Sequence, residues 1–456
     1  MTNVLNTILY IGLAILILLF MITVHEFGHY IVGKIFRFKI NEFAIGMGPA
    51  LFKRKSKKTG EIFSIRIFPL GGYCAFEGED DDSENEHAFN NKAPYKRILV
   101  LIAGATMNLI FGILILMLSI GIYGQLLVQT YDIKTDQTYQ EYSLKNDDII
   151  VAINNQNVFM SSDVAMILQG KKQGDIVEVK VKEKVNGAYK TITRQVKLRN
   201  DVSSQNLTDV FSAFESLGIA TIVRIDKVGE NSPIIAGETY LQRLNTATSY
   251  EDCERIFNVQ TFIDYAKTFN MGDTLSVYVS VKGQSQPQLI EIPVSVDLTN
   301  LDNERVLNAL GIKETSKLLK YSTCNTHFSF FETIGRTFEY SVNIAGTIFR
   351  TLGELLTGKL GMSAVGGPVT TITTTANAIE VGGFNYFLEI AGFIGINLAV
   401  FNLLPIPALD GSRVVFCLIE WIRKKPINKK IEGIVHGVGL ILLLGFSVLV
   451  DILQLF

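Results

Sequence analysis

Two histidines and a glutamate stand at the end of an apolar stretch with the spacing His-Glu-x-x-His. They are His25, Glu26 and His29, within FMITVHEFGHYIVGK at residues 20–34. On a helix, residues i and i+4 share a face, so both imidazoles would point to one centre with the carboxylate beside them. This pattern is typical of zinc hydrolases, in which the histidines bind the metal and the glutamate acts on water. A chance match is the alternative, and with five histidines in 456 residues it would be rare.

The position of the motif favours the metal interpretation. No charged residue occurs from Val4 to Val24, which is about the 20 residues that a helix needs to cross a bilayer. Polar groups at membrane depth are costly and usually functional. The stretch lacks a basic N-terminal region and a small-x-small cleavage site, so we do not interpret it as a signal peptide.

The rest of the chain predicts a polytopic α-helical membrane protein. Hydrophobic residues make up 48% of the sequence, and the net charge of −2 gives no indication of nucleic-acid binding. Four cysteines are scattered without CxxC spacing, so no disulfide framework is predicted. Charge-free runs mark four transmembrane helices at Val4–Val24, 98–123, Ile390–Leu409 and Ile434–Val450.

Basic residues set the expected orientation. Lysines and arginines are dense in the loop after the first span and in the loop between the third and fourth spans, and the N-terminus has none before the first span. The positive-inside rule places both loops in the cytoplasm. Both termini and the long region at 124–383 are then expected outside the cell.

This orientation indicates where a third zinc ligand should lie. Catalytic zinc usually has three protein ligands, and the ligand must be at the cytoplasmic depth of His25 and His29. Asp410 is the only acid in NLAVFNLLPIPALDGSRVVF, residues 397–416, and it follows Pro405 and Pro407, which stop the helix. An ordinary Asp-Gly turn at the end of the helix is the alternative.

Residues 39–76 predict strands and a hairpin just inside the membrane. Aromatic and β-branched runs flank a Lys-Thr-Gly turn region. An exposed strand edge could capture an extended substrate, and Gly46 and Gly48 would permit close backbone approach. A purely structural hairpin is the alternative. The acidic run at 77–87 that follows predicts a flexible cytoplasmic loop.

The region predicted to lie outside repeats itself. Segments 162–187 and 260–283 both predict a helix, a Gly-Asp turn and an alternating strand, and LKNDDIIVAINNQNV and VGENSPIIAG resemble PDZ fragments. We therefore expect two PDZ-like α+β domains, at 124–216 and 217–306. Such units could bind a peptide end or block the path to the membrane, and both possibilities remain open.

Two further features lie near the C-terminal spans. A polar stripe at 332–354 predicts a helix on the membrane surface that links the PDZ pair to the core. His436, in the fourth span, is expected to face the bundle rather than to bind metal.

Four segments together resemble a known family. HEFGH at 25–29, FAIGMGP at 43–49, FSIRIFPLGGYC at 63–74 and NLLPIPALDG at 402–411 are similar to the site-2 proteases, intramembrane zinc metalloproteases. The similarity is greatest to the regulator-of-sigma-E type with tandem PDZ domains, and it covers nearly the whole chain in order. AGATMN at 103–108 departs at Ala105, where many relatives have proline, and keeps Asn108.

The resemblance implies that His25, His29 and Asp410 bind Zn²⁺. Glu26 would be the general base. Roles on the substrate side are expected for five more residues: Asn402, Phe43, Ile45, Gly46 and Gly48.

The expected function is zinc-dependent cleavage of transmembrane segments in the bacterial plasma membrane. Substrates would be single-pass membrane proteins already trimmed by a site-1-type protease: an anti-sigma factor, a signal-peptide remnant or a pheromone precursor. A catalytically idle PDZ-bearing scaffold and a metal transporter are the alternatives. Neither explains all the features, since a scaffold needs no intact metal motifs and a transporter needs no PDZ units.

The expected organisation has nine parts. They are span one with the His-Glu-x-x-His motif (1–33), the cytoplasmic membrane-associated β-loop and acidic loop (34–96), span two (97–123), the PDZ-like domains (124–216 and 217–306), a linker with the amphipathic helix (307–383), span three (384–411), a cytoplasmic loop (412–431) and span four (432–456).

Overall fold

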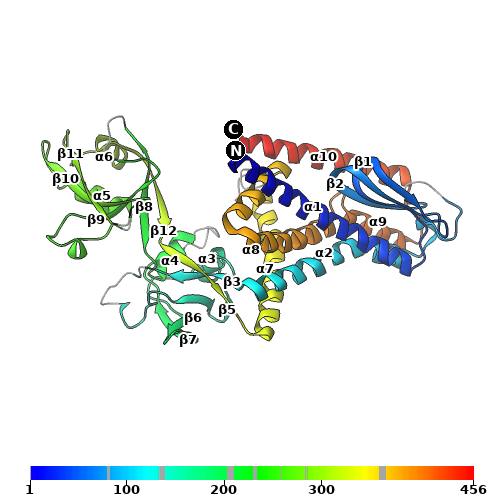
Figure 1. Ribbon diagram of the computed structural model, residues 1–456, viewed down its shortest axis with the longest axis horizontal. Helices are drawn as coiled ribbons and strands as arrows, with labels where there is room; N and C mark the ends of the chain where they lie inside the picture. The colour runs from blue at the N-terminus through cyan, green and yellow to red at the C-terminus, as the bar shows by residue number, and fades with distance from the viewer. Residues whose placement is uncertain are drawn as a thin grey trace. The chain divides into compact units, whose positions relative to one another are not determined.

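Four helices are long and apolar enough to cross a membrane, by length and composition. They are α1 (Thr2–Ile35), α2 (Pro94–Tyr123), α8 (Pro368–Leu403) and α10 (Lys429–Leu455) (Figure 1). The computed structural model describes residues 2–455 apart from 80–82, 132, 134–138, 203–209, 230–233, 257, 283, 285 and 359–365. Parts of the predicted acidic loop and of the PDZ-like segment at 228–237 therefore lie outside the described residues.

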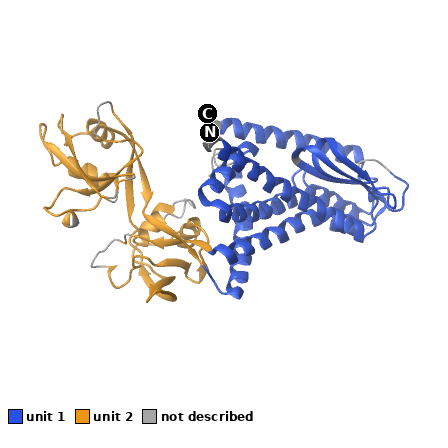
Figure 2. Cartoon of the chain, in the orientation of Figure 1, with its two compact units in different colours: residues 1–124, 327–456 blue, residues 125–326 orange. Residues whose placement is uncertain are grey.

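The chain divides into two compact units (Figure 2). Unit 1 combines residues 1–124 and 327–456 and contains the four apolar helices, and unit 2 is residues 125–326. The start of α1 and the end of α10 lie at one end of unit 1, whereas the hairpin of β1 (Ile40–Lys55) and β2 (Ile62–Phe76) lies at the opposite end (Figure 1).

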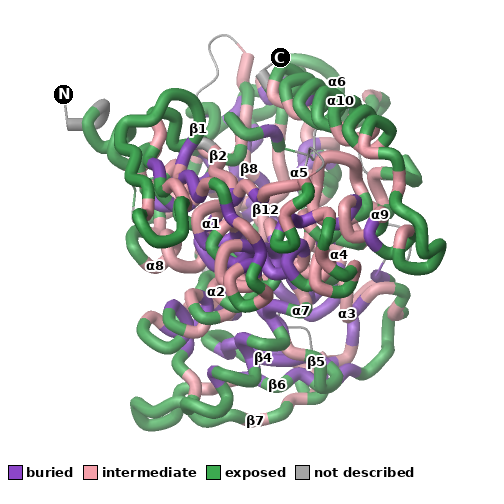
Figure 3. Tube along the Cα trace, turned by 90° about the vertical axis from the view of Figure 1, so that its right-hand side faces the viewer, coloured by how far each residue is buried: buried purple, intermediate pink, exposed green. Residues whose placement is uncertain are grey.

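Small residues let three of the apolar helices approach closely. A Cβ added to Gly28 of α1 would lie 2.4 Å from the carbonyl oxygen of Ala103 in α2. A Cβ added to Gly112 of α2 would lie 2.9 Å from the carbonyl oxygen of Gly392 in α8. Close backbone approach at small residues is the common way in which membrane helices associate. The α10 helix is mostly exposed, as its green colour in Figure 3 shows.

The third apolar helix differs from its predicted span at 384–411. It begins at Pro368, bends at Gly383 (φ 65°, ψ −149°) and ends at Leu403. Asp410 is therefore not on this helix. It is the first residue of α9 (Asp410–Arg423), so the segment 412–431, predicted to be a loop, is helical as far as Arg423. Pro405 and Pro407 separate the two helices because neither can continue the backbone hydrogen bonding of α8.

The predicted hairpin is present, and it folds back on itself. Residues 43–45 of β1 pair with 72–74 on one side and with 63–65 on the other. Glycines allow the bends, since Gly46 and Gly48 both have φ +83°. Several large apolar side chains of the hairpin are exposed: Met47, Leu51, Phe52, Phe63, Ile65, Ile67 and Phe68.

The predicted amphipathic helix is α7 (Phe330–Leu356), and it has three faces. One face, including Thr337, Tyr340 and Ile344, is buried, and α7 contacts α2 and α8. A second face exposes large apolar side chains, among them Phe331 and Phe338. The polar stripe lies between them, although Arg336 at its edge is buried and burial lowers the pKa of this guanidinium to about 10.

Unit 2 contains two antiparallel sheets, each over its own apolar core. The first has the strand order β13-β3-β4-β6-β7 with β5 beside β4, and the second has the order β11-β10-β9-β8-β12. The strands are β3 (Gln125–Thr130), β4 (Ile149–Ile153), β5 (Gln156–Asn157), β6 (Ile176–Val185), β7 (Ala188–Lys197), β8 (Thr221–Val228), β9 (Thr239–Leu244), β10 (Thr274–Val281), β11 (Gln288–Pro293), β12 (Ile312–Leu319) and β13 (Tyr321–Thr326). The helices of unit 2 are α3 (Ser161–Leu168), α4 (Val210–Ser216), α5 (Val259–Ala266) and α6 (Asn303–Ala309).

The two repeated segments form the same turn. The Asp175 carboxylate accepts a hydrogen bond from the Lys172 amide (2.9 Å), and the Asp273 carboxylate accepts one from the Asn270 amide (2.7 Å). Each Gly-Asp pair therefore closes a helix-to-strand connection in the same way. The similarity of sequence at 162–187 and 260–283 thus corresponds to a similarity of local structure.

The predicted boundary at residue 306 is wrong, because it cuts through α6. The chain then enters β12, which pairs with β8 in the second sheet, and β13, which pairs with β3 in the first sheet. The strands β12 and β13 lie in the predicted linker at 307–383. Periodicity could not reveal them, since both are short and their partners are distant in sequence.

Candidate metal centre

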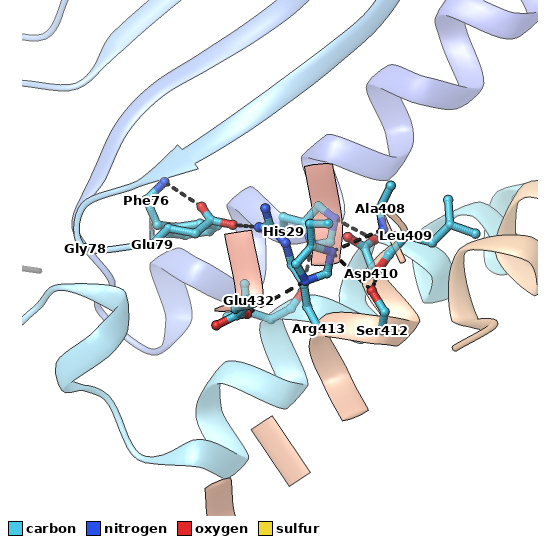
Figure 4. A network of polar contacts seen from close by, with 12 residues as sticks. His29, Phe76, Gly78, Glu79, Ala408, Leu409, Asp410, Ser412, Arg413 and Glu432 are labelled. Carbon is cyan, nitrogen blue, oxygen red and sulfur yellow. Dashed lines mark hydrogen bonds and ion pairs between the residues drawn. The ribbon is translucent and has the colours of Figure 1, made fainter. Parts of the chain in front are cut away.

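Three ligand atoms from two helices converge in unit 1. The Nε2 atoms of His25 and His29, one turn apart on α1, are 3.1 Å from each other. The Asp410 Oδ2 atom, at the start of α9, lies 2.9 Å from the first and 3.3 Å from the second. Figure 4 shows Asp410 and His29 facing each other across this point.

These separations fit a tetrahedral zinc site. Two ligand atoms that are each about 2.1 Å from a zinc ion at tetrahedral angles lie ~3.4 Å apart. Two imidazoles and one carboxylate are also a donor set that zinc accepts, and they leave a fourth position for water or substrate. Both histidines are buried, at 7% exposure, so bulk water has little access to the two imidazoles.

The hydrogen bond of His29 prepares it to bind metal. Its Nδ1 lies 2.8 Å from the Val100 carbonyl oxygen on α2. A carbonyl can only accept, so Nδ1 carries the proton and Nε2 presents its lone pair to the centre. Metal-binding histidines usually have such an outer partner, which fixes the ring and its tautomer.

Two amides surround the other nitrogen of His25. The side-chain amides of Asn108 on α2 and Asn402 on α8 lie 3.5 Å and 3.4 Å from Nδ1. The Asn108 Oδ1 is buried and accepts no hydrogen bond from the described residues. If the Asn108 amide is rotated by 180°, its Oδ1 accepts a hydrogen bond from Nδ1–H of His25. Nε2 of His25 then carries no proton and can bind a metal.

A glycine on α2 makes room for the imidazoles. A Cβ added to Gly104 would lie 2.5 Å from Nε2 of His29 and 2.7 Å from Cε1 of His25. Any side chain at this position would therefore occupy the space of the ligands. The α2 helix contributes no ligand, but it forms a wall of the centre.

A tight link between α8 and α9 presents Asp410. Within it, Ala408 has φ +81°, a region in which residues other than glycine cost roughly 1–2 kcal/mol. A Cβ added to Gly411 would lie 2.3 Å from the carbonyl oxygen of Leu404, so the link folds closely onto itself. The Asp410-Gly411 pair thus allows the tight turn of the chain and also supplies the ligand.

Glu26 lies partly buried beside the hairpin. A Cβ added to Gly72 of β2 would be 3.4 Å from Cγ of Glu26. The glutamate is next to His25 in sequence, and its side chain is therefore on the side of the ligands that faces β2.

The four hairpin residues that were predicted to contact substrate are used within the hairpin itself. Phe43 is buried and its ring packs against those of Tyr30 (5.4 Å) and Phe63 (6.0 Å). Phe43 and Ile45 pair on both edges, so strand addition at these residues is ruled out. Gly46 and Gly48 are required by the hairpin itself, because a Cβ at either position would clash with Phe68.

Two residues of the centre were not assigned from the sequence. No motif in the sequence marks Gly104, and Asn108 stands out only as a position that this chain shares with the family. Asn108 carries the only carboxamide in the apolar run at 98–123, and such a polar group at membrane depth is a signal that could have revealed it.

Comparison with known proteins is consistent with this geometry. The model of Peptidase family M50 matches residues 13–446. The chain is 26% identical over 455 residues to "Regulator of sigma E protease" of Haemophilus influenzae, with 96% of each chain covered. It is 29% identical over 449 residues to a protein of Clostridium perfringens named as a "Putative zinc metalloprotease", with 97% of this chain and 98% of the relative covered. The chain belongs to peptidase family M50, the site-2 proteases, and it is an intramembrane zinc metalloendopeptidase.

Proposed function

We propose that this enzyme cleaves transmembrane segments of single-pass membrane proteins that another protease has already trimmed. His25, His29 and Asp410 hold the zinc ion, and Glu26 is the general base. The convergence of the three ligand atoms within 3.3 Å of one another carries this proposal. The name of the Haemophilus relative supports a role in regulated proteolysis.

The chemistry follows from the residues at the centre. When bound, zinc polarises the scissile carbonyl and lowers the pKa of the attacking water. Glu26 takes the proton of this water and later donates it to the leaving amine. The buried imidazoles and the Gly104 wall keep bulk water away from the reacting atoms.

Asn402 has a position that suits two tasks. Its amide is 3.4 Å from Nδ1 of His25, and when its oxygen is turned toward this nitrogen it accepts from Nδ1–H and orients the ligand. It is also one residue before the end of α8, at the edge of the link that carries Asp410. A role toward the substrate or the developing oxyanion is compatible with this position.

The hairpin is suited to hold an unwound substrate. A transmembrane helix shields its peptide bonds by its own hydrogen bonds, so it must be extended before cleavage. Residues 72–74 pair with β1 on one edge only among the described strands, and Gly72 lies against Glu26. We place strand addition at this edge rather than at 43–45. The exposed apolar side chains of the hairpin, such as Leu51 and Phe68, favour its immersion in lipid.

We further propose that the hairpin is on the cytoplasmic side and that the PDZ-like units are outside the cell. Cysteine labelling tests this orientation in a variant in which the half-exposed Cys324 is replaced by serine. A membrane-impermeant thiol reagent applied to intact cells is expected to modify Lys190→Cys in unit 2 and not Lys57→Cys in the hairpin. The reverse pattern would contradict the orientation.

Unit 2 is proposed to act as a size filter. A folded ectodomain cannot easily follow its helix past two β-sheet domains, whereas a short stub can. The structure guides the deletion that tests this idea, since β12 and β13 belong to unit 2 and must be removed with the rest. Replacement of residues 125–326 by a short flexible linker is therefore the appropriate change.

The deletion variant is expected to cleave untrimmed substrates and to keep its activity on trimmed ones. Both activities are measured on purified protein whose zinc content equals that of the full chain. Slower cleavage of trimmed substrates would instead indicate that unit 2 recognises a new peptide end. Refusal of untrimmed substrates by the zinc-loaded variant would contradict the filter.

A further inference from the structure

The imidazole of His436 touches the chain on both sides of Asp410. His436 is on α10, and its Nδ1 lies 3.2 Å from the backbone nitrogen of Ala408 and 3.4 Å from Oγ of Ser412. Figure 4 shows Ala408 and Ser412 flanking Asp410. Among the described residues the converging ligand set consists of His25, His29 and Asp410, and His436 does not belong to it.

The chemistry of the contact defines the tautomer. A backbone amide can only donate, so Nδ1 of His436 accepts a hydrogen bond from Ala408 N–H. The Ser412 hydroxyl already donates to the Leu409 carbonyl oxygen at 2.8 Å, so it does not compete for this acceptor. The proton of His436 is therefore on Nε2, which faces Glu432 at 3.9 Å, one turn earlier on α10.

The contact is made where the backbone is strained. Ala408 has φ +81°, and residues in this region keep their conformation only when their surroundings hold them. The acceptor on His436 fixes the peptide plane that precedes this residue. The direction of the chain into Asp410, two residues later, depends on that plane.

A close approach of α10 makes the contact possible. A Cβ added to Gly439, one turn after His436, would lie 2.3 Å from Cβ of Pro407. The backbone of α10 thus rests directly on the link. At its far end α10 is fastened by Asp451, which accepts hydrogen bonds from the Val369 and Thr370 amides of α8 (both 3.1 Å).

We propose that His436 is a positioning residue for the zinc ligand Asp410. Its imidazole holds the α8–α9 link in the conformation that presents the carboxylate to His25 and His29, and Gly439 allows α10 to come close enough. This inference rests on the proposed zinc site, and it assigns to the fourth apolar helix a part in metal binding although that helix supplies no ligand.

The test is zinc affinity, measured by competition with a chromophoric chelator on the purified full-length protein. His436→Leu is expected to bind zinc about tenfold more weakly, at the lower end of the 10–100-fold typical for loss of a group bonded to a ligand, because His436 acts on Asp410 through the backbone of Ala408. His436→Asn is expected to stay within about threefold of the wild type, because Oδ1 of asparagine can accept the same hydrogen bond in nearly the same place.

Two alanine variants separate this role from general damage to α10. Gly439→Ala is expected to weaken zinc binding at least tenfold, since it pushes α10 off Pro407. Gly437→Ala is the matched control, because nothing lies within 4 Å of a Cβ at that position, and its zinc affinity should equal that of the wild type.

The outcomes distinguish this inference from the proposed function. If the wild-type protein fails to bind zinc, the zinc site itself is wrong. If the wild type binds zinc and His436→Leu binds it equally well, the positioning role is wrong while the site stands. Equal weakening by His436→Leu and His436→Asn would also overturn the inference, because the hydrogen-bond acceptor would then be irrelevant.

Discussion

Replacement of Glu26 by glutamine is expected to abolish peptide hydrolysis and to leave zinc bound. Glutamine keeps the size and polarity of the side chain but cannot take a proton from water. General acid–base catalysis typically contributes 10²–10⁴-fold, so we expect a loss of turnover of at least about 100-fold. Metal content should be unchanged, since Glu26 is not among the converging ligand atoms.

The measurement is cleavage of a model transmembrane substrate by purified protein, together with zinc content. Glu304→Gln is the control for the chemical change, because Glu304 is exposed on α6 in unit 2. Turnover of Glu26→Gln close to that of the wild type would show that another residue is the base.

Substitution of Asp410 by alanine should have the largest effect on the metal. Two imidazoles alone leave zinc one protein ligand short. We expect zinc affinity to fall by more than the roughly 10–100-fold that the loss of an outer-shell partner costs, with hydrolysis lost in parallel. Chelator competition measures the affinity, and far-UV circular dichroism checks that the helices are intact.

Asp264→Ala is a suitable control for this substitution, since Asp264 is exposed on α5, far in sequence from the ligands, and its carboxylate accepts a hydrogen bond from the Gln260 side chain at 2.7 Å. Full zinc occupancy in Asp410→Ala would mean that the third ligand is a different residue.

Much of unit 1 was predictable from the sequence, because membrane helices and metal motifs leave strong local signals. Long charge-free runs revealed the four apolar helices, and His-Glu-x-x-His revealed one face of α1. The hairpin was also predictable from its aromatic and β-branched runs. Its double pairing at 43–45 was not, because register in a folded-back hairpin depends on glycine bends at positions 46 and 48.

The surroundings of the ligands could not be predicted, because they depend on close contacts between helices far apart in sequence. The placement of Gly104 against both imidazoles follows from how α1 packs on α2. The contact of His436 with Ala408 follows from how α10 rests on the α8–α9 link. In unit 2, β13 pairs with β3 in the first sheet, although all strands of the second sheet lie between these two strands in the sequence.

Anomalous diffraction at the zinc edge from crystals of the purified, zinc-loaded protein tests the central claim most directly. We expect one strong peak per chain, within bonding distance of Nε2 of His25, Nε2 of His29 and a carboxylate oxygen of Asp410. A zinc peak at other residues, or none at this centre, would contradict the account of how this protease binds its metal.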